Sequence, residues 1–202
     1  MSGPPELSRR ILHALARELC PRVRIWGEPP DLLFAYSEDG EVGVRGLDLP
    51  GVLWLMGPTA QVLSDLADGA ERIMPMWEHV TPPGVLGVGL RCEARSTGDL
   101  DAVELSALSL AEMLVRPAEN RIRFACAVDR NGNTYSVETD PAGRVIGGRI
   151  VQPADRHSAA FGSIPDALDR LLAAVLGMPM PRRPYSFSSP DNREEPDSEQ
   201  DE

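Results

Sequence analysis

The sequence predicts an α+β fold in which helices pack on one face of a largely antiparallel sheet or pair of sheets. Three observations carry this prediction. Apolar residues recur at helical spacing in separate segments, apolar and polar residues alternate in others, and turn-forming residues separate the alternating segments. We expect a single globular α+β domain at residues 1–178, with room for a subdivision near 96–118, and a disordered acidic tail at 179–202.

The chain should open with a helix and a hairpin. Leucine or isoleucine recurs every four residues from position 7 to position 19, which predicts an amphipathic helix. Residues 32–36 and 42–47 read as two strands joined by a three-residue loop that ends at Gly40. This register keeps Phe34 on an apolar face, whereas a two-residue turn would place it opposite an arginine and mix the faces.

The middle of the chain alternates between strands and helices. A continuous apolar run at residues 52–56 is typical of a strand buried on both faces. A helix should then run from residue 59 to about 66 or 73, where Met74-Pro75 ends it. Strict alternation predicts a strand over residues 86–94, and a core-facing helix is expected over residues 100–115.

The last third of the chain should contain a second hairpin, a further strand and a helix. Asn131-Gly132 is a preferred two-residue type I′ turn, and it places Cys126 opposite Val137. A strand over residues 144–151 follows, in which adjacent glycines suggest a bulge or a sheet edge. Ser163 is the expected N-cap of the final helix.

The absence of lysine excludes several chemistries. All 20 basic residues of the 202 are arginine. A P-loop requires lysine at its phosphates, kinases require one on a strand, and Schiff-base enzymes require a titratable amine that arginine does not provide. The sequence also lacks the G-x-S-x-G, G-x-G-x-x-G and H-E-x-x-H motifs.

The charge distribution argues against nucleic acid as a partner. The net charge is −11, and residues 191–202 alone carry seven acids and one arginine. No basic run is present to neutralise phosphates. The sequence shows no run of about 18 apolar residues and no signal-peptide pattern, so we expect a cytoplasmic protein that does not bind membranes.

Cysteine and histidine are too scattered for a metal site. The three cysteines lie 72 and 34 residues apart, and no histidine lies within four residues of another histidine or a cysteine. We therefore expect no metal and no cofactor. If the chain is instead a small hydrolase or transferase, His79 and His157 are the candidate catalytic residues, because each has an acid close by in the sequence.

Four residues are candidates for partner contact. Gly87 and Gly89 leave one face of their strand without side chains, which would let a partner, a ligand or a helix of this same chain approach closely. Trp26 and Trp77 flank loops, where tryptophan often anchors interfaces. Trp54 belongs to an apolar run and is expected in the core.

Three stretches resemble uncharacterised proteins of high-GC Gram-positive bacteria and their phages. They are PPGVLGVGLRCE at 82–93, AVDRNGNTY at 127–135 and PDALDRLL at 165–172. The opening order of helix, three strands and helix is similar to the type III secretion chaperone and YbjN-like fold, which implies binding of extended peptides.

These observations lead to one preferred function and two alternatives. We expect a non-enzymatic accessory protein, chaperone-like in character, that binds another protein or peptide through a sheet face or groove. The alternatives are the histidine-dependent hydrolase or transferase and a phage structural or assembly protein, which would form a homo-oligomer.

Overall fold

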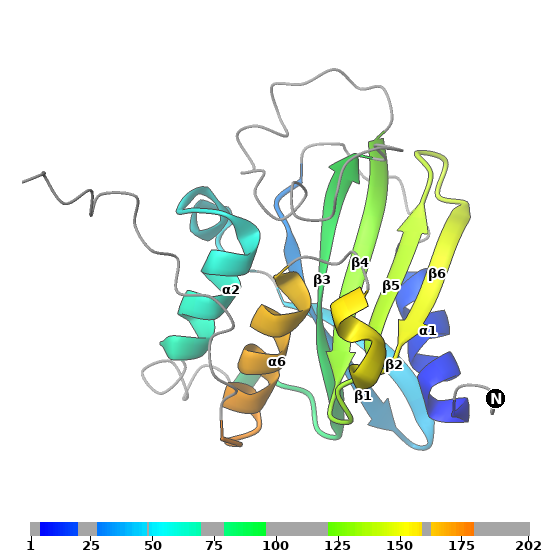
Figure 1. Cartoon of the computed structure of the whole chain (residues 1–202). Coiled ribbons are helices and arrows are strands. Elements are labelled where there is room, and N and C mark those ends of the chain that lie inside the picture. Colours follow the sequence, from blue (N-terminus) through cyan, green and yellow to red (C-terminus); the bar gives the residue numbers. More distant parts are fainter. Residues whose placement is uncertain are drawn as a thin grey trace, which may run out of the picture.

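The computed structural model describes residues 5–19, 28–47, 49–69, 79–95, 121–158 and 163–179, and one antiparallel sheet of six strands lies at its centre (Figure 1). The elements in chain order are α1 (Glu6–Leu19), β1 (Asp31–Glu38), β2 (Glu41–Leu47), η1 (Gly51–Leu55), α2 (Thr59–Asp68), β3 (Val85–Arg95), β4 (Arg121–Asp129), β5 (Thr134–Thr139), β6 (Val145–Val151), η2 (Pro153–Ser158) and α6 (Ile164–Val175). The strand order across the sheet is β2-β1-β3-β4-β5-β6. The predicted α+β class is thereby confirmed.

Several predictions can be placed against these elements. Helices α1, α2 and α6 lie where helical spacing predicted them. Ser163 occupies the N-cap position of α6, but its side chain makes no capping hydrogen bond. Strands β3 and β4 pair, so the strands on either side of the predicted helix at 100–115 belong to one sheet. That helix, the subdivision near 96–118, the continuation of α2 to residue 73 and the tail beyond residue 179 lie outside the described residues.

Helices cover both faces of the sheet, so the prediction that they pack on one face is wrong. Leu32 and Phe34 of β1 lie in an apolar cluster with α2 and α6, whereas Leu33 and Ala35 lie in a second cluster with α1. Figure 1 shows α2 and α6 on one side of the sheet and α1 on the other. Because side chains of a strand alternate between faces, a strand that is apolar at four successive positions requires a cover on each side.

The β1–β2 hairpin has a two-residue turn, which makes the predicted register wrong. Asp39 (φ 48°) and Gly40 (φ 80°) both adopt positive φ, as a type I′ turn requires. Phe34 therefore lies opposite Arg45. The expected separation of apolar and polar faces did not apply, because β1 is buried on both faces and Arg45 is exposed on the edge strand.

The β4–β5 hairpin has a three-residue loop, so the predicted two-residue Asn131-Gly132 turn is wrong. The loop begins at Asp129, whose carboxylate accepts hydrogen bonds of 2.8 and 2.9 Å from two backbone N–H groups inside the turn. Aspartate at the first position and glycine at the fourth are typical of a type I turn. Every strand pair consequently shifts by one residue, and Cys126 lies opposite Ser136.

The run at residues 52–56 is not a strand. It forms η1, a 3₁₀ turn in which Leu53 N–H donates to the Pro50 carbonyl at 3.0 Å and Met56 N–H donates to the Leu53 carbonyl at 3.2 Å. Pro50 and Pro58 bracket the run and leave it too short to enter the sheet, so its backbone groups are satisfied locally. Trp54 is the buried residue of this turn, which confirms the prediction for that residue, and Leu53 packs partly against the same cluster.

A bulge alters the faces of β3. Ala35 pairs with Gly87, but the next residue of β1, Tyr36, pairs with Val85, which leaves Leu86 without a partner on β1. Leu86 packs with the α1 cluster, although strict alternation had placed it with Val88 on the opposite face. One extra residue in a strand moves the side chains before it to the other face.

A buried polar network ties α1 to the β4–β5 turn. The Tyr135 hydroxyl donates a 2.6 Å hydrogen bond to the Asp129 carboxylate, and the Ser8 hydroxyl lies 3.1 Å from the same phenol oxygen. Because the single phenolic proton is directed at Asp129, Ser8 donates to Tyr135. Burial, together with the hydrogen bond to Asp129, raises the pKa of Tyr135 above its ordinary value of 10.0.

Replacing Tyr135 with phenylalanine should lower the free energy of unfolding by about 1–3 kcal/mol at pH 7, because buried Asp129 loses one of its donors. Because the pKa of Tyr135 is higher in the folded state than in the unfolded state, its contribution to stability is fully present below about pH 10. This contribution is lost progressively as the pH rises through the folded-state pKa. The difference between wild type and Tyr135→Phe should therefore shrink above about pH 10. Urea denaturation at several pH values measures this difference, and one that stayed constant into strongly alkaline solution would contradict the assignment.

Candidate functional site

Gly87 and Gly89 lie inside the fold. Both are buried, and their neighbours Ala35 and Ala127 on the adjacent strands belong to the cluster under α1. A Cβ at Gly89 would come within 2.8 Å of the Ala127 Cβ. These glycines therefore allow close packing within this chain, which is the alternative that the sequence left open beside partner contact.

Within the described residues, His79 has no catalytic partner. His79 is exposed, and no hydrogen bond or ion pair joins it to another described residue. The side chain of His157 is not among the described parts of the chain. Trp26 and Trp77 lie outside the described residues altogether. Burial raises the pKa of the Cys92 thiol to about 12, with a smaller contribution from Glu93, so this thiol is protonated near neutral pH.

The described residues contain no cluster of three or more histidine, cysteine or acidic side chains that could hold a metal ion. Within the same residues, no helix combines the length and apolar character needed to cross a membrane. Neither feature therefore supplies a functional site in this part of the chain.

The most exposed apolar side chains of the described fold lie together on and beside η1. Val52, Leu55 and Met56 are 64%, 61% and 77% exposed, and we call these three residues the η1 surface. The backbone of this turn is anchored to the core, since Trp54 is 2% exposed and packs in the cluster with α2 and α6. This single 3₁₀ turn thus buries Trp54, packs Leu53 partly against the core and leaves the three residues of the η1 surface exposed.

A recess of about 620 Å³ begins at η1. Gly51, the first residue of η1, lines it together with residues from the start of β1, the end of β2 and the middle of β3; they are Glu28, Pro29, Asp31, Gly46, Leu47, Leu49 and Arg91. One part of the wall is apolar and another is charged. The η1 surface and this recess are therefore continuous through Gly51.

Arg91 provides a fixed polar group in this recess. Its guanidinium pairs with Glu18 of α1 at 2.8 Å and with Asp31 of β1, and its side chain is only 11% exposed. Two carboxylates from different elements fix the planar guanidinium, so the polar part of the wall is preorganised. The described lining residues include carboxylates, a guanidinium and apolar groups.

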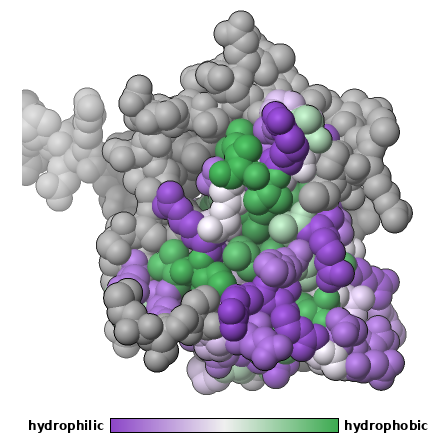
Figure 2. Space-filling view, turned by 90° about the vertical axis from the view of Figure 1, so that its right-hand side faces the viewer, coloured by the Kyte–Doolittle hydropathy of each residue, from purple (hydrophilic) through white to green (hydrophobic). Residues whose placement is uncertain are grey.

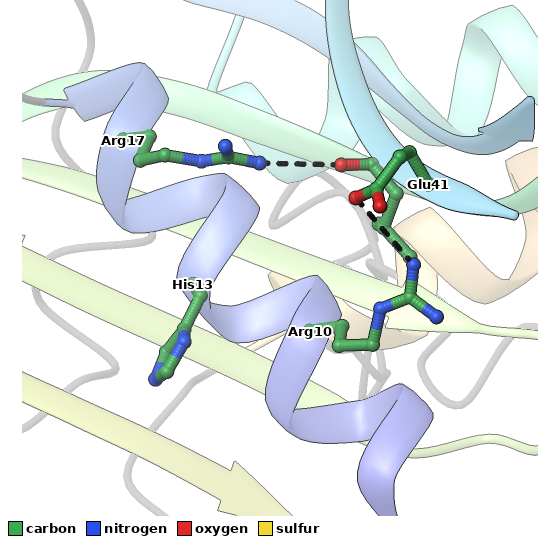
Figure 3. A pocket seen from close by; sticks show the side chains of 5 residues that line it. Arg10, His13, Arg17 and Glu41 are labelled. Atoms are coloured by element: carbon green, nitrogen blue, oxygen red, sulfur yellow. Dashed lines mark hydrogen bonds and ion pairs between the residues drawn. The ribbon is translucent and has the colours of Figure 1, made fainter.

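A second, smaller recess of about 260 Å³ lies between α1 and β2 (Figure 3). Arg10 donates to the Gly40 carbonyl and pairs with Glu41 at 3.7 Å, and Arg17 donates to the Val42 carbonyl at 3.3 Å. Figure 3 shows His13, from the same helix, pointing away from Glu41. Arg17 thus occupies one backbone acceptor of the edge strand β2 and Arg10 one of the turn before it, so the arginines of α1 protect this end of the sheet edge.

The sequence reasoning missed the η1 surface because the apolar run at 52–56 was interpreted as a buried strand. The signal that could have found it is the bracketing of the run by Pro50-Gly51 and Gly57-Pro58. A five-residue run between two such pairs has no room for strand pairing, and most of its side chains then remain outside.

Comparison with protein-family models, with curated proteins and with solved structures finds no significant match for this chain.

Proposed function

We propose that this chain is a non-enzymatic accessory protein that binds another protein, and that the η1 surface is the centre of its binding site. The observation that carries the proposal is the exposure of Val52, Leu55 and Met56 on one turn whose backbone is anchored by a buried tryptophan. Clustered apolar side chains on a rigid support are typical of the centre of protein interfaces. The partner that suits this surface presents an apolar segment.

The recess beside η1 supports the same proposal, because it supplies the polar rim that interfaces need. Stable specific complexes bury about 1,200 Å² or more in total, which is more than three side chains provide. The recess walls extend the contact area, and the Arg91 guanidinium with its carboxylates gives directional groups at its border. The apolar centre would then contribute most of the affinity and the charged border most of the specificity.

The test compares two variants in partner capture from the native cell. We expect the double variant Leu55→Asp/Met56→Asp to lose a stoichiometric partner that wild type retains, because two carboxylates would be desolvated on binding. With the purified partner, the dissociation constant should rise at least about tenfold, which is about 1.4 kcal/mol. Circular dichroism should show an unchanged fold, since both positions are exposed.

Leu7→Asp is the matched control. Leu7 is also an exposed leucine, at 39%, but it belongs to α1, which packs on the face of the sheet opposite the Trp54 cluster. The proposal requires the control to bind the partner as wild type does. It would be abandoned if Leu55→Asp/Met56→Asp bound equally well, or if wild type captured no partner at all.

A further inference from the structure

The two edges of the sheet differ in how they are protected. At the β2 edge, Arg17 of α1 donates to the Val42 carbonyl, and Arg10 donates to the Gly40 carbonyl in the turn before β2. At the β6 edge, Val145 and Ile146 are 49% and 55% exposed. Figure 2 looks onto this side of the molecule and shows hydrophobic side chains gathered along it. An edge strand with exposed apolar side chains is a template for pairing with another strand.

The sequence of β6 reads nearly the same in both directions. It is V-I-G-G-R-I-V, with Gly148 at its centre. If two copies of the strand lie antiparallel about a two-fold axis at Gly148, Ile150 meets Ile146 and Val151 meets Val145 of the second copy. Ile146 is the extra residue of a bulge, because Gly147 pairs with Glu138 and Val145 pairs with Thr139 of β5, so the regular pairing covers residues 147–149 and the apolar contacts flank it at the bulge. The one unlike pair is Gly147 with Arg149, so the two arginines do not oppose each other. Directly opposed apolar pairs are favourable in antiparallel sheets.

The backbone N–H and C=O groups that this pairing needs are the ones that β6 directs away from β5. Asp129 N–H donates to the Asn133 carbonyl and closes the β4–β5 hairpin. Hydrogen-bonded pairs recur at every second residue of an antiparallel ladder, so the odd-numbered residues of β5 bond to β4 and the even-numbered ones bond to β6. Ser136 is one of these, and it lies opposite Arg149. Gly148 and Ile150 fall between the bonded positions and direct their N–H and C=O groups away from the sheet. A two-fold axis at Gly148 joins the outward groups of Gly148 with those of Gly148 in the second copy, whereas Ile150 faces Ile146, where the bulge interrupts the ladder.

Charge complementarity favours the same register. Glu138 of β5 lies opposite Gly147, and its carboxylate would be 3.3 Å from a Cβ placed there. In the two-fold pair, Arg149 of the second copy lies opposite Gly147 on that same face. Because glycine has no side chain, this arginine can reach across it to Glu138. Arg149 is exposed, and no ion pair joins either residue to another described residue.

We propose that two copies of this chain associate through β6, with the two-fold axis at Gly148, so that the sheet continues from one copy into the other. The occupant of the edge is a second copy because the strand is complementary to itself in its apolar residues, its outward backbone groups and its Arg149–Glu138 charges. The inference does not depend on the η1 surface, whose recess is lined by β2 at the other edge of the sheet. Such a dimer carries two η1 surfaces.

Light scattering and disulfide trapping test the dimer directly. Both use a Cys20→Ser variant, so that this cysteine does not contribute to cross-linking. Wild type should reach twice the 22.0 kDa of the chain as its concentration rises. Gly148→Cys should form a covalent dimer on mild oxidation, because opposed residues in a hydrogen-bonded antiparallel pair lie about 5.5 Å apart, within disulfide range. A Cβ at this position would meet only Leu12 at 3.8 Å and the Ser136 carbonyl at 3.9 Å, so the variant should fold.

Gly147→Cys is the matched control for trapping. This residue lies opposite Arg149 of the second copy, so two cysteines at position 147 are more than about 7 Å apart and should not form a disulfide. Equal trapping at positions 147 and 148 would overturn the proposed axis. Light scattering that shows only monomer up to about 0.5 mM would overturn the dimer. Pairing of the β6 edge with a different protein, but not with a second copy, would also overturn it.

A charge exchange tests the register independently. Arg149→Glu should weaken the dimer about tenfold or more, because it places a carboxylate near Glu138 of the other copy. The double variant Glu138→Arg/Arg149→Glu should restore wild-type association, since the pair is then reversed. A double variant as weak as the single one would contradict this register.

Discussion

Replacing Trp54 with alanine should lower the free energy of unfolding by about 3–5 kcal/mol, which is the range for removing a large aromatic side chain from a core. Trp54 is 2% exposed and packs between the sheet and helices α2 and α6. Its indole N–H has no hydrogen-bond partner among the described residues, so the loss comes from packing. Urea denaturation followed by circular dichroism measures the change.

Val52→Ala is the control for this prediction, because Val52 lies two residues away on the same turn and is 64% exposed. Its effect should stay within about 0.5 kcal/mol of zero. If Trp54→Ala changed stability as little as Val52→Ala does, η1 would not be anchored to the core. The proposed binding site would then lose the rigid support on which it depends.

Replacing Gly87 with alanine should lower the free energy of unfolding by about 3 kcal/mol or more and could prevent folding altogether. A Cβ at this position would overlap the carbonyl oxygen of Val128 and lie 3.2 Å from the Cα of Asp129. Both atoms belong to the backbone of β4, so no side-chain rotation relieves the overlap. The strand would have to move away from its neighbour, which would break the β3–β4 pairing.

Gly46→Ala is the matched control, since Gly46 also lies in a strand but a Cβ there meets only the end of the Leu33 side chain, at 3.9 Å. Alanine at position 46 should be tolerated or slightly stabilising, because it reduces the freedom of the unfolded chain. Thermal unfolding separates the two glycines. Similar melting temperatures for Gly87→Ala and Gly46→Ala would show that β3 and β4 are not as closely packed as described.

The two hairpins show where local sequence rules apply and where they need the rest of the fold. In the β4–β5 hairpin, the deciding interaction is local: Asp129 holds the turn through its own carboxylate, and the aspartate-to-glycine spacing was visible in the sequence. In the β1–β2 hairpin, the apolar pattern predicted the wrong register. Apolar and polar residues separate onto opposite faces only in a strand that has one solvent-exposed face. Phe34 opposite Arg45 is acceptable because Arg45 lies on the edge strand β2, where its side chain is exposed.

The candidate binding surfaces depended still more on tertiary context. An apolar run such as residues 52–56 has the same composition whether it is buried or exposed. The 3₁₀ turn between Pro50 and Pro58, with Trp54 buried, leaves Val52, Leu55 and Met56 outside. The near-palindromic sequence of β6 can be seen in the sequence alone. It bears on association only because the structure places β6 at an edge of the sheet.

The sequence by itself determined the α+β class, the three described helices and the positions of all six described strands, because periodicity and turn residues act over a few neighbouring positions. It also excluded every chemistry that requires lysine. The tertiary structure alone decided the covering of both sheet faces, the register of the β1–β2 hairpin, and the burial of Gly87 and Gly89. These features depend on contacts between segments far apart in the chain, which no local pattern encodes.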